Sequence, residues 1–500
     1  MSSLKNLINT LNNSILFQYV LFVFFTLLYY FLLKDYVLYR DDARPPLIVN
    51  YNHSIFDLIQ AVRYEGTPML YHIMLWVLSC FVKLTPLVVK IFHLLIHVFI
   101  LITILFLIKL PNFYRLLILL QIPQIAYVLY VRQYSIAVLL IFLFAYLYTT
   151  YEMDNIWIYI VLFLLPQTIF HGFIVAFVFF LFIAIRRYIE TKQIFHKYYL
   201  IPFFGFILSI LQLIPPKDFV SGLNEWRPLF SHENLLFIRQ LFWDIFLDNL
   251  LIYIAFILLI FIVTKDLLKK NKALAYNFLF CLVILLVSFY IFGAGKYSFN
   301  RHHWLASCTI MSFLIMLTYP IKQKITNLTW KEYGLLALVF FSFLNFKSLI
   351  PKYLGLNSNG QNAAIYLDKN YPNNNILGEL EYYIEPIVFY RKEAKPYFSL
   401  GRNEFVKYNV LNHKSVDFTK FKEHECTFKV SELINDLNNT PDIVLQSSPI
   451  LVLSAFEIVN DINMNLEGVK IKQNYFLKHL KDFDGARFEN YSLYLVKRLN

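Results

Sequence analysis

Residues 15–42 read ILFQYVLFVFFTLLYYFLLKDYVLYRDD, a long apolar run followed by a charged Arg-Asp-Asp triplet. A membrane-spanning helix needs about 20 mainly apolar residues, which the stretch 15–34 provides. The run is longer than the apolar core of a signal peptide, and no small-residue cleavage site follows it. We therefore predict a retained first membrane span, with Arg40, Asp41 and Asp42 just beyond its end.

The composition of the whole chain agrees with this prediction. Hydrophobic residues make up 58% of the 500 residues, charged residues make up 16%, and the mean hydropathy is +0.54. A soluble domain would carry about 25% charged residues. The chain is therefore predicted to be an α-helical polytopic membrane protein. Its four cysteines include no Cys-x-x-Cys pair, so neither a disulfide scaffold nor a structural zinc site is predicted.

Further apolar runs predict further spans. The stretch 113–131 is interrupted by Pro123 and could form a re-entrant pair of half-helices, so the total is eleven spans, or thirteen if this pair crosses twice. The eleven runs are 15–34, 69–85, 86–108, 133–150, 155–170, 171–187, 198–215, 247–264, 274–294, 303–321 and 331–349.

Three basic connections, 186–197, 265–272 and 322–332, orient these spans. The positive-inside rule assigns them to the cytoplasm, which places the N-terminus inside and the C-terminal tail outside. It also places the loop 35–68 outside, although the three arginines of this loop do not favour that side. The tail from residue 350 has as many acidic as basic residues, so the net charge of +12 lies in the membrane part and does not indicate nucleic-acid binding.

Two units follow from these patterns: a transmembrane domain, 1–349, and a small α/β domain outside the membrane, 350–500. In the outer loop, apolar residues from Ile55 to Val62 have helical spacing, and Ser54 is a suitable N-cap, so a helix in the membrane interface is predicted. In the tail, 442–446 and 492–496 are predicted strands, and 363–369 and 432–437 are predicted helices.

The predicted topology gathers polar residues from distant parts of the chain on the outer face. Asp41 and Asp42 could accept a proton from a hydroxyl group or hold a divalent cation; the alternative is a solvated pair beyond the lipid. Arg132 could bind phosphate through its planar fork, or could anchor the chain at the interface. The run Arg301-His302-His303 suits a phosphate or pyrophosphate group. His171, in a turn between spans, is a weaker candidate.

These motifs resemble a group of bacterial GT-C glycosyltransferases that is similar to the protein O-mannosyltransferases and the aminoarabinose transferases. The order and approximate spacing agree over residues 35–320. The matching segments are Tyr39-Arg-Asp-Asp-Ala-Arg, Arg63-Tyr-Glu-Gly-Thr-Pro-Met-Leu-Tyr, Arg132-Gln-Tyr134, His171-Gly172 and Arg301-His302-His303. Two positions depart from the pattern: Asp42 stands where Glu is usual, and Thr67 where His is usual.

The resemblance implies a GT-C fold, a polyprenyl-phosphate-linked sugar donor and a catalytic acid in the first outer loop. Asp41, Asp42 and Glu65 are the catalytic candidates, and Asp41 is favoured because the aspartate is unchanged there. The remaining residues of the matching motifs divide into two groups. Donor phosphate is assigned to Arg132, Arg301, His302 and His303, and other substrate contacts to Arg63, Tyr134 and His171.

The function that follows is transfer of a sugar from a polyprenyl-phosphate donor to a glycan, lipid or protein acceptor at the outer face of the cell membrane. Two alternatives remain: a polysaccharide polymerase, and a transporter or flippase of lipid-linked sugars, which would need polar residues through the middle of the bilayer. The expected partners are the lipid-linked donor, the acceptor and membrane lipids, without nucleic acid. The cofactor is left open, with a divalent cation as one option.

Overall fold

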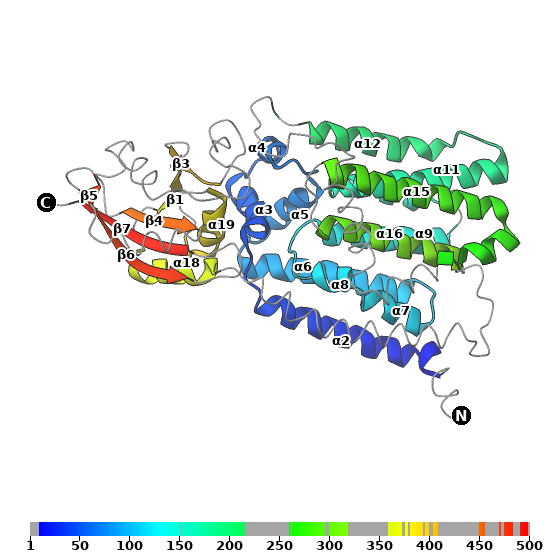
Figure 1. Ribbon diagram of the computed structural model, residues 1–500, viewed down its shortest axis with the longest axis horizontal. Coiled ribbons are helices and arrows are strands. Elements are labelled where there is room, and N and C mark those ends of the chain that lie inside the picture. Colours follow the sequence, from blue (N-terminus) through cyan, green and yellow to red (C-terminus); the bar gives the residue numbers. More distant parts are fainter. Residues whose placement is uncertain are drawn as a thin grey trace.

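The computed structural model combines a long helical bundle with a smaller unit of strands and helices at one end (Figure 1). The bundle is formed by the first two thirds of the chain and the α/β unit by residues 359–498. The structure describes residues 10–151, 153–214, 216, 260–261, 263–295, 300–318, 359–372, 376–378, 381–393, 396–399, 404–408, 450–455, 470–471, 475–483 and 491–498.

The bundle helices confirm the predicted helical membrane fold. Four helices in the described part of the chain are long and apolar enough to cross a membrane: Ile15–Lys34, Pro86–Leu107, Phe170–Thr191 and Lys272–Ile291. Shorter apolar helices lie beside them. The bundle elements are α2 (Ile15–Lys34), α6 (Pro86–Ile102) with a π-helical end (Thr103–Leu107), α7 (Asn112–Leu119), α8 (Ile122–Ala126), α9 (Tyr134–Thr150), α10 (Ile156–Leu164), η3 (Leu165–Gln167), α11 (Phe170–Thr191), η4 (Lys197–Tyr199), α12 (Leu200–Leu213), α15 (Lys272–Gly295) and α16 (Asn300–Thr318).

The two ends of the bundle differ in charge. One end carries the α/β unit, and the opposite end, here called the basic end, carries the connection from α11 to α12 and the residues before α15 (Figure 1). The helix α15 runs antiparallel to α11, because Asn277 donates to the Phe182 carbonyl oxygen while Phe289 lies against His171. The basic connections 186–197 and 265–272 thus share one end, as the charge pattern requires. The connection 322–332 lies outside the described residues.

The path of the chain between α2 and α9 differs from the prediction. The run 69–85 does not form a span: α5 (Leu70–Ser79) has 10 residues, about 15 Å, which is half the thickness of the hydrocarbon core. It stays at the α/β end, where the Trp76 indole donates to the carbonyl oxygen of His53 at 3.0 Å. The carbonyl oxygen of Leu84, just before α6, likewise accepts from Asn50 at 2.9 Å.

The run 113–131 takes the place of that span and crosses the bundle once. At the basic end, Asn112 donates to the carbonyl oxygens of Leu11 and Ser14, both at 2.8 Å. At the other end, Arg132 pairs with Asp41. Two short helices, α7 and α8, make up much of this crossing, and Pro123 lies at the start of α8. Because the segment begins at one end of the bundle and finishes at the other, it crosses once and not twice. Hydropathy could not make this distinction, because a protein-covered helix and a lipid-covered helix are equally apolar.

The first outer loop forms three elements besides α5: α3 (Arg40–Tyr51), α4 (Ile55–Val62) and η1 (Arg63–Glu65). The predicted helix α4 is confirmed, and the Ser54 hydroxyl accepts from the backbone N–H of Phe56 at 3.2 Å. The helix α3 was not predicted. It begins beyond the turn that ends α2 and carries Asp41 and Asp42 in its first turn, where the helix dipole favours negative charge.

The α/β unit contains a seven-stranded mixed sheet with the order β3-β2-β1-β4-β7-β6-β5. The strand β1 is parallel to β2 and β4, while β4, β7 and β6 are antiparallel neighbours, with Leu451 opposite Leu495. The predicted helix at 363–369 and strand at 492–496 are confirmed; 432–437 and 442–446 lie outside the described residues. The elements are α18 (Gly360–Asn370), β1 (Ile376–Gly378), α19 (Glu381–Tyr390), β2 (Tyr397–Ser399), β3 (Glu404–Val406), β4 (Ile450–Ala455), β5 (Lys470–Ile471), β6 (Tyr475–Phe483) and β7 (Tyr491–Arg498).

Candidate active site at the end of the bundle

The two aspartates of the first outer loop occupy different surroundings. Asp41 accepts a hydrogen bond from the Tyr39 hydroxyl at 2.9 Å and pairs with Arg132 Nη1 at 3.3 Å, and 28% of its side chain is exposed. Asp42 is fully buried and accepts from the Tyr36 hydroxyl at 2.6 Å. Burial, followed by the charge of Asp42, raises the pKa of Tyr36, which therefore stays a hydrogen-bond donor.

Both aspartates lie in the first turn of α3. Their separation into one partly exposed and one buried group follows, since successive side chains of a helix are rotated by about 100°. Only Asp41 is accessible to a ligand in the structure as it stands.

A second ion pair involves Arg44, which follows Asp41 by three residues on α3. Arg44 Nη2 is 2.7 Å from the Glu65 carboxylate, and both side chains are almost fully buried. Burial by itself lowers the pKa of Arg44, but the charges of Glu65, Glu385 and Asp41 outweigh it and raise this pKa above its ordinary value. Glu385 belongs to α19 of the α/β unit and is fully buried. The cluster therefore combines residues of both parts of the molecule.

Arg132 reaches this cluster from a stretch of non-helical backbone inside the bundle, 127–133. Backbone carbonyl groups in such a segment need hydrogen-bond donors, because lipid and apolar side chains supply none. The carbonyl oxygen of Tyr127 lies 2.9 Å from His93 Nε2, 3.3 Å from His97 Nε2 and 3.3 Å from the Ser135 hydroxyl. The Tyr71 hydroxyl donates to the carbonyl oxygen of Val131 at 3.1 Å. These bonds hold the segment that presents Arg132 to Asp41.

The other predicted motifs meet nearby. His303 and His171 are buried at the adjoining ends of α16 and α11, close enough for their charges to interact. Trp304, next to His303, packs against Tyr130, which in turn is close to Tyr36. Arg301 and His302 lie in the first turn of α16, at the same end of the bundle, but their side chains lie outside the described part of the structure.

Two of the predicted substrate residues are not brought into this cluster. Arg63 is exposed on η1. Tyr134 is buried and stacks on Tyr127 with ring centroids 5.4 Å apart, so it contributes to packing beneath the site. Both remain candidates on the resemblance alone.

Four residues of the cluster were not predicted from the sequence: Tyr36, Arg44, His72 and Glu385. Recognition of α3 as a helix would have found Arg44, because residues three apart lie on one face, as Asp41 and Arg44 do. His72, on α5, is buried near Arg44 and Arg132, and neither ring nitrogen has a hydrogen-bond partner in the described structure. No local signal marks Glu385, whose part in the cluster depends on how the α/β unit docks.

A metal site is not evident in the described residues, which contain no group of three or more His, Cys, Asp or Glu side chains arranged to hold an ion. The described cluster contains a partly exposed carboxylate, two mostly buried arginines and an imidazole with unused hydrogen-bonding atoms. They could remove a proton from a hydroxyl group and stabilise a phosphate anion.

Comparisons with known proteins agree with the fold. No protein-family model matches the chain, and no curated protein is detectably similar in sequence. Among solved structures, the chain is similar to ArnT from Cupriavidus metallidurans, determined with bound undecaprenyl phosphate. The TM-score is 0.55 at 10% identity, and the match covers 96% of this chain and 98% of ArnT. The chain therefore has the fold of ArnT, the GT-C fold that its outer-loop motifs predicted.

Proposed function

We propose that this protein is an integral-membrane glycosyltransferase that moves a sugar from a polyprenyl-phosphate donor to an acceptor hydroxyl group. The observation that carries the proposal is the meeting of Asp41 and Arg132, which lie 3.3 Å apart and come from distant parts of the chain. An acid beside a phosphate-binding cation is what such a transfer needs. The similarity to ArnT, which was crystallised with undecaprenyl phosphate, supports the choice of a lipid phosphate.

In the proposed reaction, the acceptor oxygen forms a bond to the anomeric carbon of the sugar, and the bond from that carbon to the phosphate oxygen breaks. The electron pair leaves with the lipid phosphate, whose negative charge Arg132, Arg301, His302 and His303 stabilise. Asp41 takes the proton of the acceptor hydroxyl group. His72 offers its unused ring nitrogens to the donor phosphate or to a sugar hydroxyl group.

Asp42 and Glu65 have supporting parts in this proposal. Asp42 fixes the first turn of α3 through Tyr36, and Glu65 holds Arg44. The donor phosphate competes with Asp41 for Arg132, so donor binding frees the carboxylate to act as a base. The basic end lies in the cytoplasm in this proposal, and the α/β unit lies outside the cell.

The decisive experiment incubates the purified full-length protein in nanodiscs with undecaprenyl phosphate carrying a radiolabelled sugar and with a membrane extract as the source of acceptors. Transfer of the label to a lipid, glycan or protein, lost in Asp41→Asn, is the expected result. Movement of the intact labelled lipid across proteoliposomes without chemical transfer would overturn the proposal in favour of a flippase. Extension of the labelled product by many sugars would indicate a polymerase.

A further inference from the structure

The α/β unit is joined to the first outer loop at both ends of α3. Before the helix, the backbone N–H of Leu38 donates to the hydroxyl of Tyr390 at 2.8 Å. At its C-cap, the Asn52 side chain donates to the hydroxyl of Tyr408 at 2.9 Å, and it also donates to the carbonyl oxygen of Ile48. The helix that carries Asp41 and Asp42 is thus held at each end by a tyrosine of the α/β unit.

Between these two contacts, α19 packs directly on α3, as Figure 1 shows. Glu385 lies on this helix, is fully buried, and acts electrostatically on Arg44. Arg44 in turn pairs with Glu65 at 2.7 Å. Arg44 is therefore paired with Glu65, and it lies within electrostatic range of a second carboxylate that α19 brings against α3.

The helix α19 is itself firmly anchored in the α/β unit. Arg391, immediately after the helix, donates from Nε to Asp368 of α18 at 3.0 Å, and a second guanidinium nitrogen donates to the carbonyl oxygen of Pro372 at 3.1 Å. Both side chains of the Arg391–Asp368 pair are mostly buried. A displacement of α19 would therefore carry the unit with it, and the position of Glu385 is set by the fold of the unit.

A unit that served only to bind an acceptor would not require a buried carboxylate beneath the acidic cluster. Burial of a charged group is unfavourable unless it is paired, so Glu385 is stabilised here by Arg44 and Arg44 by its acids. The same pairing ties Glu65 on η1 to α3. The first turn of α3 is thus linked to η1 by an ion pair and to α19 by packing.

We propose that Glu385 of the α/β unit is a positioning residue of the active site, which acts through Arg44 to hold Glu65 and the Asp41 turn in place. This inference rests on the proposed function. It requires, however, a structural coupling between the α/β unit and α3, and this coupling can be measured without turnover. The α/β unit then helps to position the residues of the site, in addition to any contact that it makes with the acceptor.

The test uses the full-length protein in nanodiscs and a double-mutant cycle of Glu385→Gln and Arg44→Gln. Because Glu385 acts through Arg44, Glu385→Gln should lower kcat by about tenfold, with little change in the KM for the donor. The double variant should be no slower than Arg44→Gln alone. Additive losses in the cycle would overturn the inference.

Tyr390→Phe keeps the buried charges and removes one hydroxyl group, so it provides a variant that should fold even if Glu385→Gln does not. It should lower kcat by a few-fold, the size of one neutral hydrogen bond, and speed hydrogen exchange of the α3 amides. Glu393→Gln, an exposed position in the same unit, is the matched control and should change neither quantity.

Hydrogen exchange separates the two ways in which the experiment can fail. If the wild-type protein transfers no sugar, but Glu385→Gln and Tyr390→Phe still speed exchange in α3, the proposed function fails and the coupling stands. If the wild-type protein is active and both variants leave kcat and α3 exchange unchanged, the inference fails and the proposed function stands.

Discussion

Asp41 and Asp42 are neighbours in the chain, yet one is exposed beside Arg132 and the other is buried under Tyr36. A general base must reach the acceptor, so these surroundings favour Asp41. Asparagine is nearly isosteric and cannot take up a proton. We expect Asp41→Asn to lower turnover by about 10²–10⁴ with normal folding, the usual range for loss of a general base.

Asp42→Asn is the matched comparison. It removes a buried charge that accepts from Tyr36, so it should lower the free energy of unfolding by about 1–3 kcal/mol and reduce turnover less than Asp41→Asn. Turnover and thermal unfolding of both variants are measured side by side. Near-normal turnover in Asp41→Asn would move the base to another acid, with Glu65 next.

A second prediction for single residues concerns Arg132. Its planar fork can hold two phosphate oxygens, whereas a lysine supplies a single charged centre. Arg132→Ala should reduce transfer by an amount equivalent to about 1.5–3 kcal/mol, and Arg132→Lys by less. The exposed Lys109, at the basic end, provides a control: Lys109→Ala should leave transfer unchanged. Equal activity of Arg132→Ala and the wild type would exclude this residue from the site.

At the scale of the element, the close approach of α11 to η3 explains a glycine in the motif His171-Gly172. A Cβ atom at Gly172 would lie 2.6 Å from the carbonyl oxygen of Leu165 and 2.6 Å from Thr168 Oγ1. A side chain at this position would therefore force the two elements apart. The glycine therefore permits the packing that places His171 near His303.

We accordingly predict that Gly172→Ala destabilises the protein by about 1–3 kcal/mol, the range for overpacking, as measured by thermal unfolding in detergent. The comparison variant is Gly66→Asn, because Gly66 has open space around it and a positive φ of 62° that asparagine tolerates. It should cost less than Gly172→Ala. An unchanged melting temperature for Gly172→Ala would show that α11 can shift away from η3 without loss.

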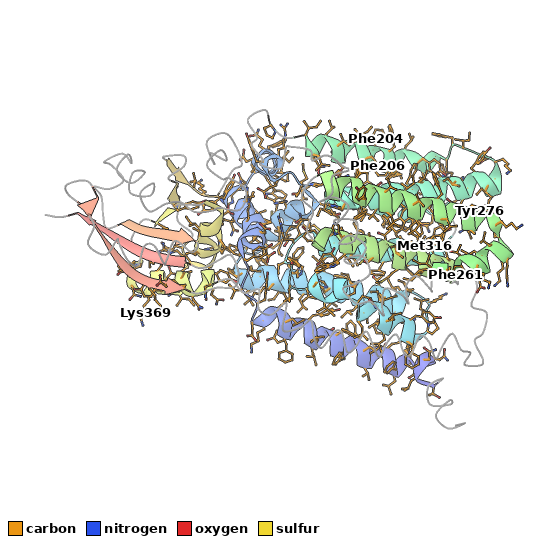
Figure 2. The ribbon with its side chains drawn as sticks, viewed as in Figure 1. Phe204, Phe206, Phe261, Tyr276, Met316 and Lys369 are labelled. Atoms are coloured by element: carbon orange, nitrogen blue, oxygen red, sulfur yellow. The ribbon has the colours of Figure 1, made fainter. Side chains whose placement is uncertain are left out.

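At the scale of the whole molecule, the side chains give the bundle two distinct ends. In Figure 2, Lys369 marks the end with the α/β unit, and Phe261 and Tyr276, on either side of the basic residues 265–272, mark the opposite end. Along the bundle between them, apolar side chains such as Phe204 point outward. Outward-facing apolar side chains and helices long enough to cross a membrane favour a bundle that is embedded in the bilayer.

Orientation is predicted from charge and can be tested by labelling. In a background with Cys80 and Cys426 replaced by serine, Lys369→Cys should react with a membrane-impermeant maleimide in intact cells. Lys269→Cys should react only after the membrane is broken, because the positive-inside rule places the basic end in the cytoplasm. Both lysines are exposed. The reverse pattern would contradict the orientation and place the acidic cluster on the cytoplasmic side.

The sequence by itself determined the helical membrane fold, the first span at 15–34 and the cap of α4, because apolar length and local capping are properties of consecutive residues. It also singled out Asp41, Arg132, His171 and His303, which the structure gathers at one end of the bundle. Two span assignments were wrong: 69–85 does not cross and 113–131 does. The two errors offset each other: 86–107 runs opposite to its predicted direction, and the described helices from α9 onward keep theirs.

Only the tertiary structure decided which charges meet. The pairing of Arg132 with Asp41, the hydrogen bond of Tyr36 to buried Asp42 and the pairing of Arg44 with Glu65 near Glu385 join residues that local sequence patterns do not connect. The physical reason is that the interaction of two charges depends on their separation and on the water between them. The folded chain sets both quantities when the non-helical segment 127–133 and the helix α19 come to lie against α3.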